Sequence, residues 1–189
     1  MNKKKILRIF LDLLETLAIS LAIFFVVYIF FVQPHRVDGS SMHPNLKDGE
    51  YLLSDKISYH FNEPKRGDVV IFHAPRVACY TFSECDFIKR IIGLPGETVE
   101  LRDGVFYING EVLPESYLGD DVQTFASGVN DALAPGQVIV LGEKEYIVVG
   151  DNRGDSSDSR SWGAIRREVI VGKAFFAYWP PEVIGFIGR

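Results

Sequence analysis

A lysine with apolar neighbours and a serine in a short loop are the residues of this chain best suited to chemistry. Lys89 lies in the run Phe87–Ile92, where its neighbours are apolar apart from Arg90. If this run is a strand, Lys89 shares a face with Phe87 and Ile91, because alternate residues point to the same side. Burial lowers the pKa of a lysine, and a neutral amine can act as general base for a nucleophilic serine.

Ser41 is the best candidate for that nucleophile. It lies between Asp38 and Leu46, in a segment that contains Gly39 and Pro44 and follows a long apolar stretch. Most serines in such loops only hydrogen-bond to nearby backbone, so other motifs must decide between a turn serine and a nucleophile.

Four motifs along the chain support the interpretation of Ser41 as a nucleophile. They are Ser41-Met42 with Pro44 and Leu46, Arg66-Gly67-Asp68-Val69-Val70, Lys89-Arg90 with Gly93-Leu94-Pro95-Gly96-Glu97, and Gly150-Asp151-Asn152-Arg153 running to Ser156-Ser157-Asp158-Ser159-Arg160. In this order they resemble the type I (leader) signal peptidases, serine proteases of the membrane that use a Ser/Lys dyad to remove signal peptides from exported proteins. The resemblance covers most of the chain from the apolar stretch onward.

The resemblance implies roles for individual residues. The nucleophile of the family immediately precedes methionine, which selects Ser41 over the adjacent Ser40, and Lys89 takes the role of general base. Ser156 is the residue expected to hydrogen-bond Lys89 and orient it. We expect a charge network to hold the surrounding loop, formed by Asp151, Arg153, Asp158 and Arg160.

The substrate pocket and the oxyanion site are less fully specified. Val37 and Ile88 match pocket-lining positions of the family and would admit only small side chains, although plain core packing is the alternative. The backbone N–H of Ser41 is the first oxyanion donor expected. Some members of the family carry a serine hydroxyl at the position of Gly39, and threonine is usual at the position of Asn45, so this chain departs from the family at both.

The apolar stretch from Leu13 to Val32 is long enough to cross a membrane as a helix. We expect a cytoplasmic N-terminus at 1–12, an anchor at 13–33 and an extracytoplasmic protease domain at 34–189. A cleaved signal peptide is the alternative, but no small-residue cleavage site follows the stretch. A basic cluster precedes it and favours a cytoplasmic N-terminus; its members are Lys3, Lys4, Lys5 and Arg8. The absence of a transit peptide favours the bacterial plasma (inner) membrane.

The net charge limits the possible binding partners, and the positions of cysteine and histidine indicate whether a disulfide or a metal site is expected. The chain has a formal net charge of −5, and its first 36 residues hold five basic and two acidic side chains, so the remainder carries −8. An acidic body argues against nucleic acid as a partner. Cys79 and Cys85 are close enough in sequence for a disulfide outside the cytoplasm, or are free thiols. The scattered histidines do not match a zinc site, and we expect neither a metal nor an organic cofactor.

After the anchor, the pattern predicts a mainly β fold. Three strands at 99–102, 105–108 and 111–113 are separated by Asp103-Gly104 and Asn109-Gly110, the dipeptides of tight hairpins. Further strands are predicted at 51–53, 69–72, 87–92, 138–141, 146–149 and 169–178. The polar segment 115–137 is interpreted as a surface excursion. The resemblance implies the β-rich catalytic domain of signal peptidases, which is similar to that of self-cleaving repressor proteases.

The sequence therefore predicts a membrane-bound serine endopeptidase that cuts exported preproteins after small residues. A repressor-type Ser/Lys protease is one alternative, disfavoured by the apolar anchor and by the lack of a DNA-binding segment. A membrane-tethered module that captures signal peptides without cutting them is the other, disfavoured by the presence of both Ser41 and Lys89.

Overall fold

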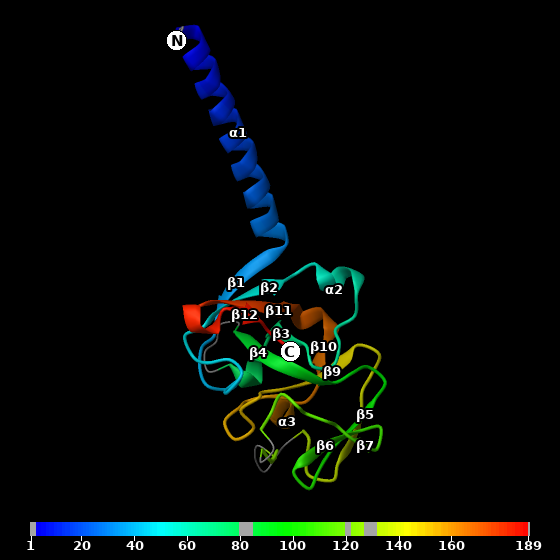
Figure 1. Ribbon diagram of the computed structural model, residues 1–189. Coiled ribbons are helices and arrows are strands. Elements are labelled where there is room, and N and C mark those ends of the chain that lie inside the picture. Colours follow the sequence, from blue (N-terminus) through cyan, green and yellow to red (C-terminus); the bar gives the residue numbers. More distant parts are fainter. Residues whose placement is uncertain (1–2, 80–84, 120–121, 127–131, 189) are drawn as a thin grey trace.

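A long N-terminal helix stands apart from a β-rich body in the computed structural model, which describes residues 3–79, 85–119, 122–126 and 132–188 (Figure 1). The helix α1 spans Lys3–Phe30, and its described side chains are exposed. Within it, Lys4–Val26 has the length and composition of a membrane span, with a mean hydropathy of 2.2. Such a helix is roughly 35 Å long, enough for a hydrocarbon layer of about 30 Å.

The helix ends before position 33, where the apolar stretch predicted its end. Strand β1 (Val32–Arg36) begins almost at once and pairs antiparallel with β2 (Tyr51–Asp55). Pro34 lies within β1, at the edge of the sheet. Proline has no N–H for a helical hydrogen bond but is tolerated in an edge strand, which accounts for the change from helix to strand.

The body contains two antiparallel sheets. The larger has the strand order β1-β2-β11-β3-β4-β9-β10, with β12 paired to β11, and the smaller has the order β7-β6-β5-β8. The remaining strands of the larger sheet are β3 (Val69–His73), β4 (Asp86–Gly93), β9 (Glu145–Val149), β10 (Ile165–Arg166), β11 (Ile170–Trp179) and β12 (Gly185–Phe186). Those of the smaller sheet are β5 (Thr98–Arg102), β6 (Val105–Ile108), β7 (Glu111–Val112) and β8 (Val138–Val140). The mainly β fold predicted from the sequence is confirmed.

Short helical segments complete the described elements. They are the α-helices α2 (Ser58–Phe61) and α3 (Ser159–Trp162), and the 3₁₀ turns η1 (Arg76–Ala78), η2 (Arg167–Val169) and η3 (Pro181–Val183). Two tight turns form the β5-β6-β7 meander as predicted. Asp103 and Asn109 adopt positive φ angles of 51° and 52°, and the glycine after each does the same, as a two-residue hairpin turn of this kind requires.

Strand β3 lies at the centre of the larger sheet and is buried on both faces. Val70 and Phe72 belong to one apolar cluster, and Val69 and Ile71 belong to another. This two-sided burial explains why the strand is a continuous apolar run instead of an alternating one. The second cluster also contains Met42 and lies beneath the loop that carries Ser41, so the loop rests on the core of the larger sheet.

The segment 115–137 packs more closely than a surface excursion implies. Its described part contains no helix or strand, in keeping with its polar composition. Leu133 is fully buried in the cluster that joins the smaller sheet to β4 and β9, and the side chain of Thr124 is also buried. The segment is therefore partly a component of the core.

Candidate active site

Segments distant in sequence meet around β4. This strand carries Lys89, the loop after β1 carries Ser41, and the loop after β9 carries the motif that begins at Gly150. Strand β4 pairs with β3 along Asp86–Arg90 but with β9 only from Arg90 onward. Among the described strands, none pairs with the second edge of Asp86–Lys89. This edge is open beside the loop that carries Ser41.

Ser41 and Lys89 are in direct contact. Nζ of Lys89 donates a hydrogen bond of 2.6 Å to Oγ of Ser41. Lys89 is only 3% exposed, and its Nζ lies 5.1 Å from the centre of the Phe87 ring, on the strand face that alternation predicted. The structure thus brings together the two residues on which the sequence interpretation depends.

The surroundings of Lys89 disfavour its charged form. Burial, the largest effect, lowers its pKa from 10.5 to about 8. The negative charges of Asp158 and Asp151 oppose this change by raising the pKa, whereas the positive charge of Arg160 lowers it. A substantial fraction of the amine is therefore neutral in mildly alkaline solution, the form that a general base needs.

A cleft of about 220 Å³ opens beside the Ser41–Lys89 pair. Its apolar lining includes both residues predicted for a substrate pocket, Val37 and Ile88. They are also part of the core cluster or packed against it, so lining the cleft and packing the core are not exclusive roles. The small volume suits small side chains.

The cleft also has a polar side, which the sequence did not identify as part of the pocket. His35 lies here, and its Nε2 is 2.9 Å from Oγ of Ser54. Burial, the largest effect, lowers the pKa of His35, which favours a neutral ring. Asp38 and Asp86 also line the cleft.

The backbone N–H of the nucleophile is available as a donor. Within the described part of the chain, the N–H of Ser41 donates to no protein group, so it is free to bind an oxyanion. Gly39 is at the position where a serine would supply a second donor, and its N–H already donates to Oδ1 of Asp48 at 2.9 Å. Ser40 instead donates from Oγ to Asp155 at 2.7 Å, away from Lys89.

Ser156 lies close to the nucleophile but does not orient Lys89 in this arrangement. Its Oγ is buried, and among the described residues it has no hydrogen-bond partner. A Cβ atom added at Gly150 would lie 2.2 Å from Oγ of Ser156 and 2.4 Å from the carbonyl oxygen of Ser41. The three residues are therefore packed together, with no room for a side chain at Gly150.

Of the four residues expected to form a charge network, two pair with each other and the other two pair with residues outside the set. Asp158 and Arg160 pair with each other at 2.8 Å, and Oδ2 of Asp158 accepts from the N–H of Gly150. Asp151 pairs with Arg90, which lies on the opposite face of β4 from Lys89.

Arg153 pairs with a residue that the sequence gave no reason to choose. Its guanidinium bonds to Glu115, at 2.8 Å for one of the contacts, and to Thr124. Both partners lie in the segment 115–137, which the sequence analysis interpreted only as a surface excursion. A glutamate in a polar segment carries no local signal for a partner 38 residues away.

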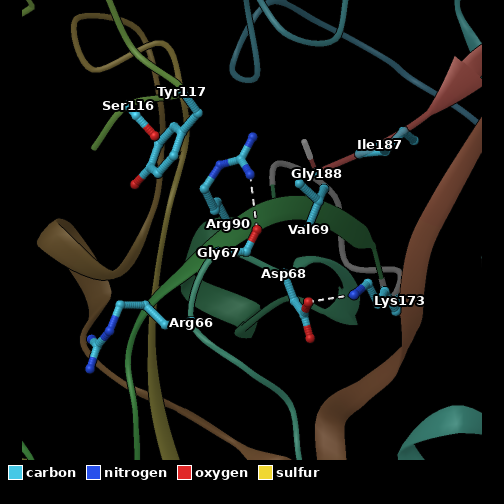
Figure 2. A pocket seen from close by; sticks show the side chains of 10 residues that line it. All are labelled: Arg66, Gly67, Asp68, Val69, Arg90, Ser116, Tyr117, Lys173, Ile187 and Gly188. Atoms are coloured by element: carbon cyan, nitrogen blue, oxygen red, sulfur yellow. Dashed lines mark hydrogen bonds and ion pairs between the residues drawn. The ribbon is translucent and has the colours of Figure 1, made fainter. Parts of the chain in front are cut away.

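A second cavity of about 220 Å³ is lined by Arg90, which lies on the opposite face of β4 from Lys89 (Figure 2). Each basic side chain in its wall pairs with a carboxylate: Lys173 with Asp68 at 2.6 Å, Arg66 with Glu97, and Arg90 with Asp151. Figure 2 draws the bond between Lys173 and Asp68, and the bond of 2.9 Å from Arg90 to the oxygen of Gly67. This cavity is separate from the cleft beside Ser41, and its cations are already neutralised.

A disulfide joins Cys79 and Cys85, in the connection between β3 and β4. Over the ranges that the structure describes, no group of three or more His, Cys, Asp or Glu side chains is arranged to hold a metal ion.

A β-rich body with a serine bonded to a buried lysine beside a small, partly apolar cleft defines a candidate hydrolase, and comparisons identify its family. The family model described as signal peptidase, peptidase S26, matches residues 10–179. The chain belongs to this family and is a serine endopeptidase, a hydrolase of the signal peptidase I type.

Relatives from several bacteria resemble most of the chain. The probable signal peptidase I-1 of Synechocystis sp. is 35% identical over 91% of this chain and 84% of its own length. Signal peptidase IB of Staphylococcus aureus is 37% identical over 90% of each chain. The crystal structure of a signal peptidase I from Enterococcus faecalis V583 is 34% identical, covers 59% of this chain and 97% of its own, and has a TM-score of 0.46.

Proposed function

We propose that this chain is a membrane-bound endopeptidase that removes signal peptides from exported preproteins, with Ser41 as nucleophile and Lys89 as general base. The observation that carries the proposal is the 2.6 Å contact between the Ser41 hydroxyl and a buried amine whose pKa is lowered to about 8. A buried neutral lysine can perform the role that histidine performs in other serine proteases.

The reaction is an acyl transfer in two stages. Neutral Lys89 accepts the proton of the Ser41 hydroxyl as Oγ attacks the scissile carbonyl, and the free N–H of Ser41 donates to the resulting oxyanion. The C–N bond then breaks, the lysine ammonium protonates the departing amine, and an ester between Ser41 and the signal peptide remains. Lys89 next removes a proton from water, and the resulting hydroxide attacks the ester carbonyl. The C–O bond to Ser41 breaks, the lysine ammonium returns the proton to Oγ of Ser41, and the signal peptide is released with a free carboxylate.

Ser156 remains our candidate for orienting Lys89. Leaving a buried hydroxyl without a hydrogen-bond partner costs free energy. Among the described residues the Ser156 hydroxyl has none, so it is available to donate or accept a hydrogen bond near the nucleophile. We propose that in the reaction this hydroxyl accepts a hydrogen bond from the Lys89 amine and orients it toward Ser41.

We infer that Val37 and Ile88 set the preference for a small residue before the cleaved bond. Replacing Ile88 by alanine should enlarge the cleft and raise kcat/KM for a preprotein with leucine at that position by about tenfold or more. Cleavage kinetics on matched alanine and leucine substrates would measure this, with Ile139→Ala in the smaller sheet as the control. An unchanged leucine-to-alanine ratio in Ile88→Ala would assign Ile88 to core packing alone.

The proposal is tested by cleavage of a preprotein with an Ala-x-Ala site, using the full chain in liposomes. We expect the native chain to cleave, and Ser41→Ala and Lys89→Ala to lose activity by about a thousandfold or more. Ser116→Ala and Lys47→Ala, which replace exposed residues of the same types, are the matched controls. Binding of the preprotein by a folded native chain without cleavage would instead indicate a capture module.

A further inference from the structure

Asn45 connects the loop of the nucleophile to a buried ion pair. Its Nδ2 donates to Oδ2 of Asp151 and to the backbone oxygen of Tyr117, each at 2.9 Å. The residue is exposed overall, yet its side-chain amide donates two hydrogen bonds. It lies four positions after Ser41, in the same loop.

The carboxylate that Asn45 contacts is itself fixed to β4. Asp151 is 2% exposed and accepts from Nε and Nη2 of Arg90 at 2.8 and 2.7 Å. The third nitrogen, Nη1, donates to the oxygen of Gly67 (Figure 2), so every guanidinium nitrogen of Arg90 has a partner. Arg90 directly follows Lys89 in β4, and the position of Asp151 is thereby tied to the strand that carries the general base.

Apart from the bond between Ser41 and Lys89, the other hydrogen bonds that leave the loop, among the described residues, go to the segment after β9. The N–H of Asn152 donates to the oxygen of Ser41 at 3.0 Å, and its side chain donates to the oxygen of Ser40 at 3.2 Å. These bonds fix the loop to a neighbouring loop. The side chain of Asn45 adds a connection to the ion pair that is anchored on β4.

We propose that Asn45 is a positioning residue for the reaction: through Asp151 and Arg90 it fixes the loop of Ser41 relative to Lys89. Tyr117 completes the arrangement, because its oxygen accepts from Asn45 while its ring lies 4.1 Å from the guanidinium of Arg90. The inference rests on the proposed roles of Ser41 and Lys89. It also gives the segment 115–137 a part in catalysis, since this segment supplies Tyr117.

The test compares three variants in the liposome assay. Asn45→Ala removes both donated bonds, and we expect kcat to fall by about 10- to 100-fold with little change in KM, because a misplaced nucleophile slows chemistry more than binding. Asn45→Asp keeps the size but turns an acceptor toward Asp151 and Tyr117, so its kcat should be lower still. Asn45→Thr keeps one donor and should recover most of the loss.

Asn62→Ala is the matched control, because Asn62 also donates from Nδ2 to a backbone oxygen but at the end of α2. Thermal unfolding of each variant is measured in parallel. Unchanged kcat in Asn45→Ala, or a fall that Asn45→Thr does not relieve, would overturn the proposal. So would activity that falls only in proportion to the unfolded fraction. A native chain that does not cleave at all would instead refute the proposed function, so the two failures are distinguishable.

Discussion

At the scale of single residues, the account depends on an amine that is held partly neutral. Because the neutral form of Lys89 is the active one, kcat/KM should rise with pH and level off above a pKa near 8. Cleavage of a preprotein across pH 6 to 10 would measure this limb. A rate that is flat through this range, or a limb near 6.5 typical of histidine, would contradict the assignment of the base.

The same burial should make Lys89 costly for stability. Its pKa is lower in the folded state than in the unfolded chain, so the folded state is penalised wherever the folded lysine is protonated. The penalty is complete below pH 8 and is relieved as pH rises toward 10.5. The penalty is about 3 kcal/mol. Replacing Lys89 by methionine would remove this penalty but would also remove its hydrogen bond, which contributes about 1 kcal/mol.

We therefore expect Lys89→Met to raise the free energy of unfolding by about 2 kcal/mol at pH 7 and by less at pH 10. Denaturant unfolding of the full chain in detergent at both pH values would measure the difference. Lys47→Met is the control, since Lys47 is exposed. A gain that does not depend on pH, or a loss at pH 7, would show that desolvation of Lys89 is not the cause.

At the scale of elements, the close approach of two loops shapes the site. Gly150 has no space for a side chain because Ser156 and the backbone of Ser41 lie against it. Gly150→Ala should displace the nucleophile loop and reduce kcat by about 100-fold. Gly154→Ala in the same loop is the matched control, because only one atom, 4.0 Å away, lies near its added Cβ. Equal activity of the two variants would mean that the loops are not packed as tightly as described.

The elements also show what sequence could and could not predict. Alternating residues and Asp-Gly or Asn-Gly turns predicted the meander, since these signals are local. Strand β1 was missed because Pro34 and the preceding apolar stretch indicated only the end of a helix. The two-residue strands β10 and β12 are too short for any periodicity.

The same distinction applies to the site. The order of the four sequence motifs identified Ser41 and Lys89. These residues lie 48 positions apart in the sequence and are hydrogen-bonded in the structure. The partners of the buried charged side chains could not be predicted in this way. Glu115 for Arg153 and Asn45 for Asp151 are fixed by how irregular segments cross in space, and no spacing rule encodes that crossing.

At the scale of the whole molecule, α1 differs from the body in that its described side chains, most of them apolar, are exposed. The exposed apolar helix is a candidate anchor, and we propose that the basic residues at its start remain cytoplasmic while the body lies outside. A membrane-impermeant maleimide applied to intact cells should then label Glu143→Cys but not Lys5→Cys. The native chain, whose cysteines are joined, is the control. Labelling of Lys5→Cys alone would reverse the topology.

The most direct measurement of the central claim is capture of the acyl-enzyme. The full chain is mixed with a preprotein and quenched with acid during the first turnovers, and its peptides are analysed by mass spectrometry. We predict the signal peptide fragment ester-linked to Ser41, removable by hydroxylamine and missing in Lys89→Ala. The same fragment on Ser40 or Ser156, or cleavage by a chain that never carries it on Ser41, would contradict the account.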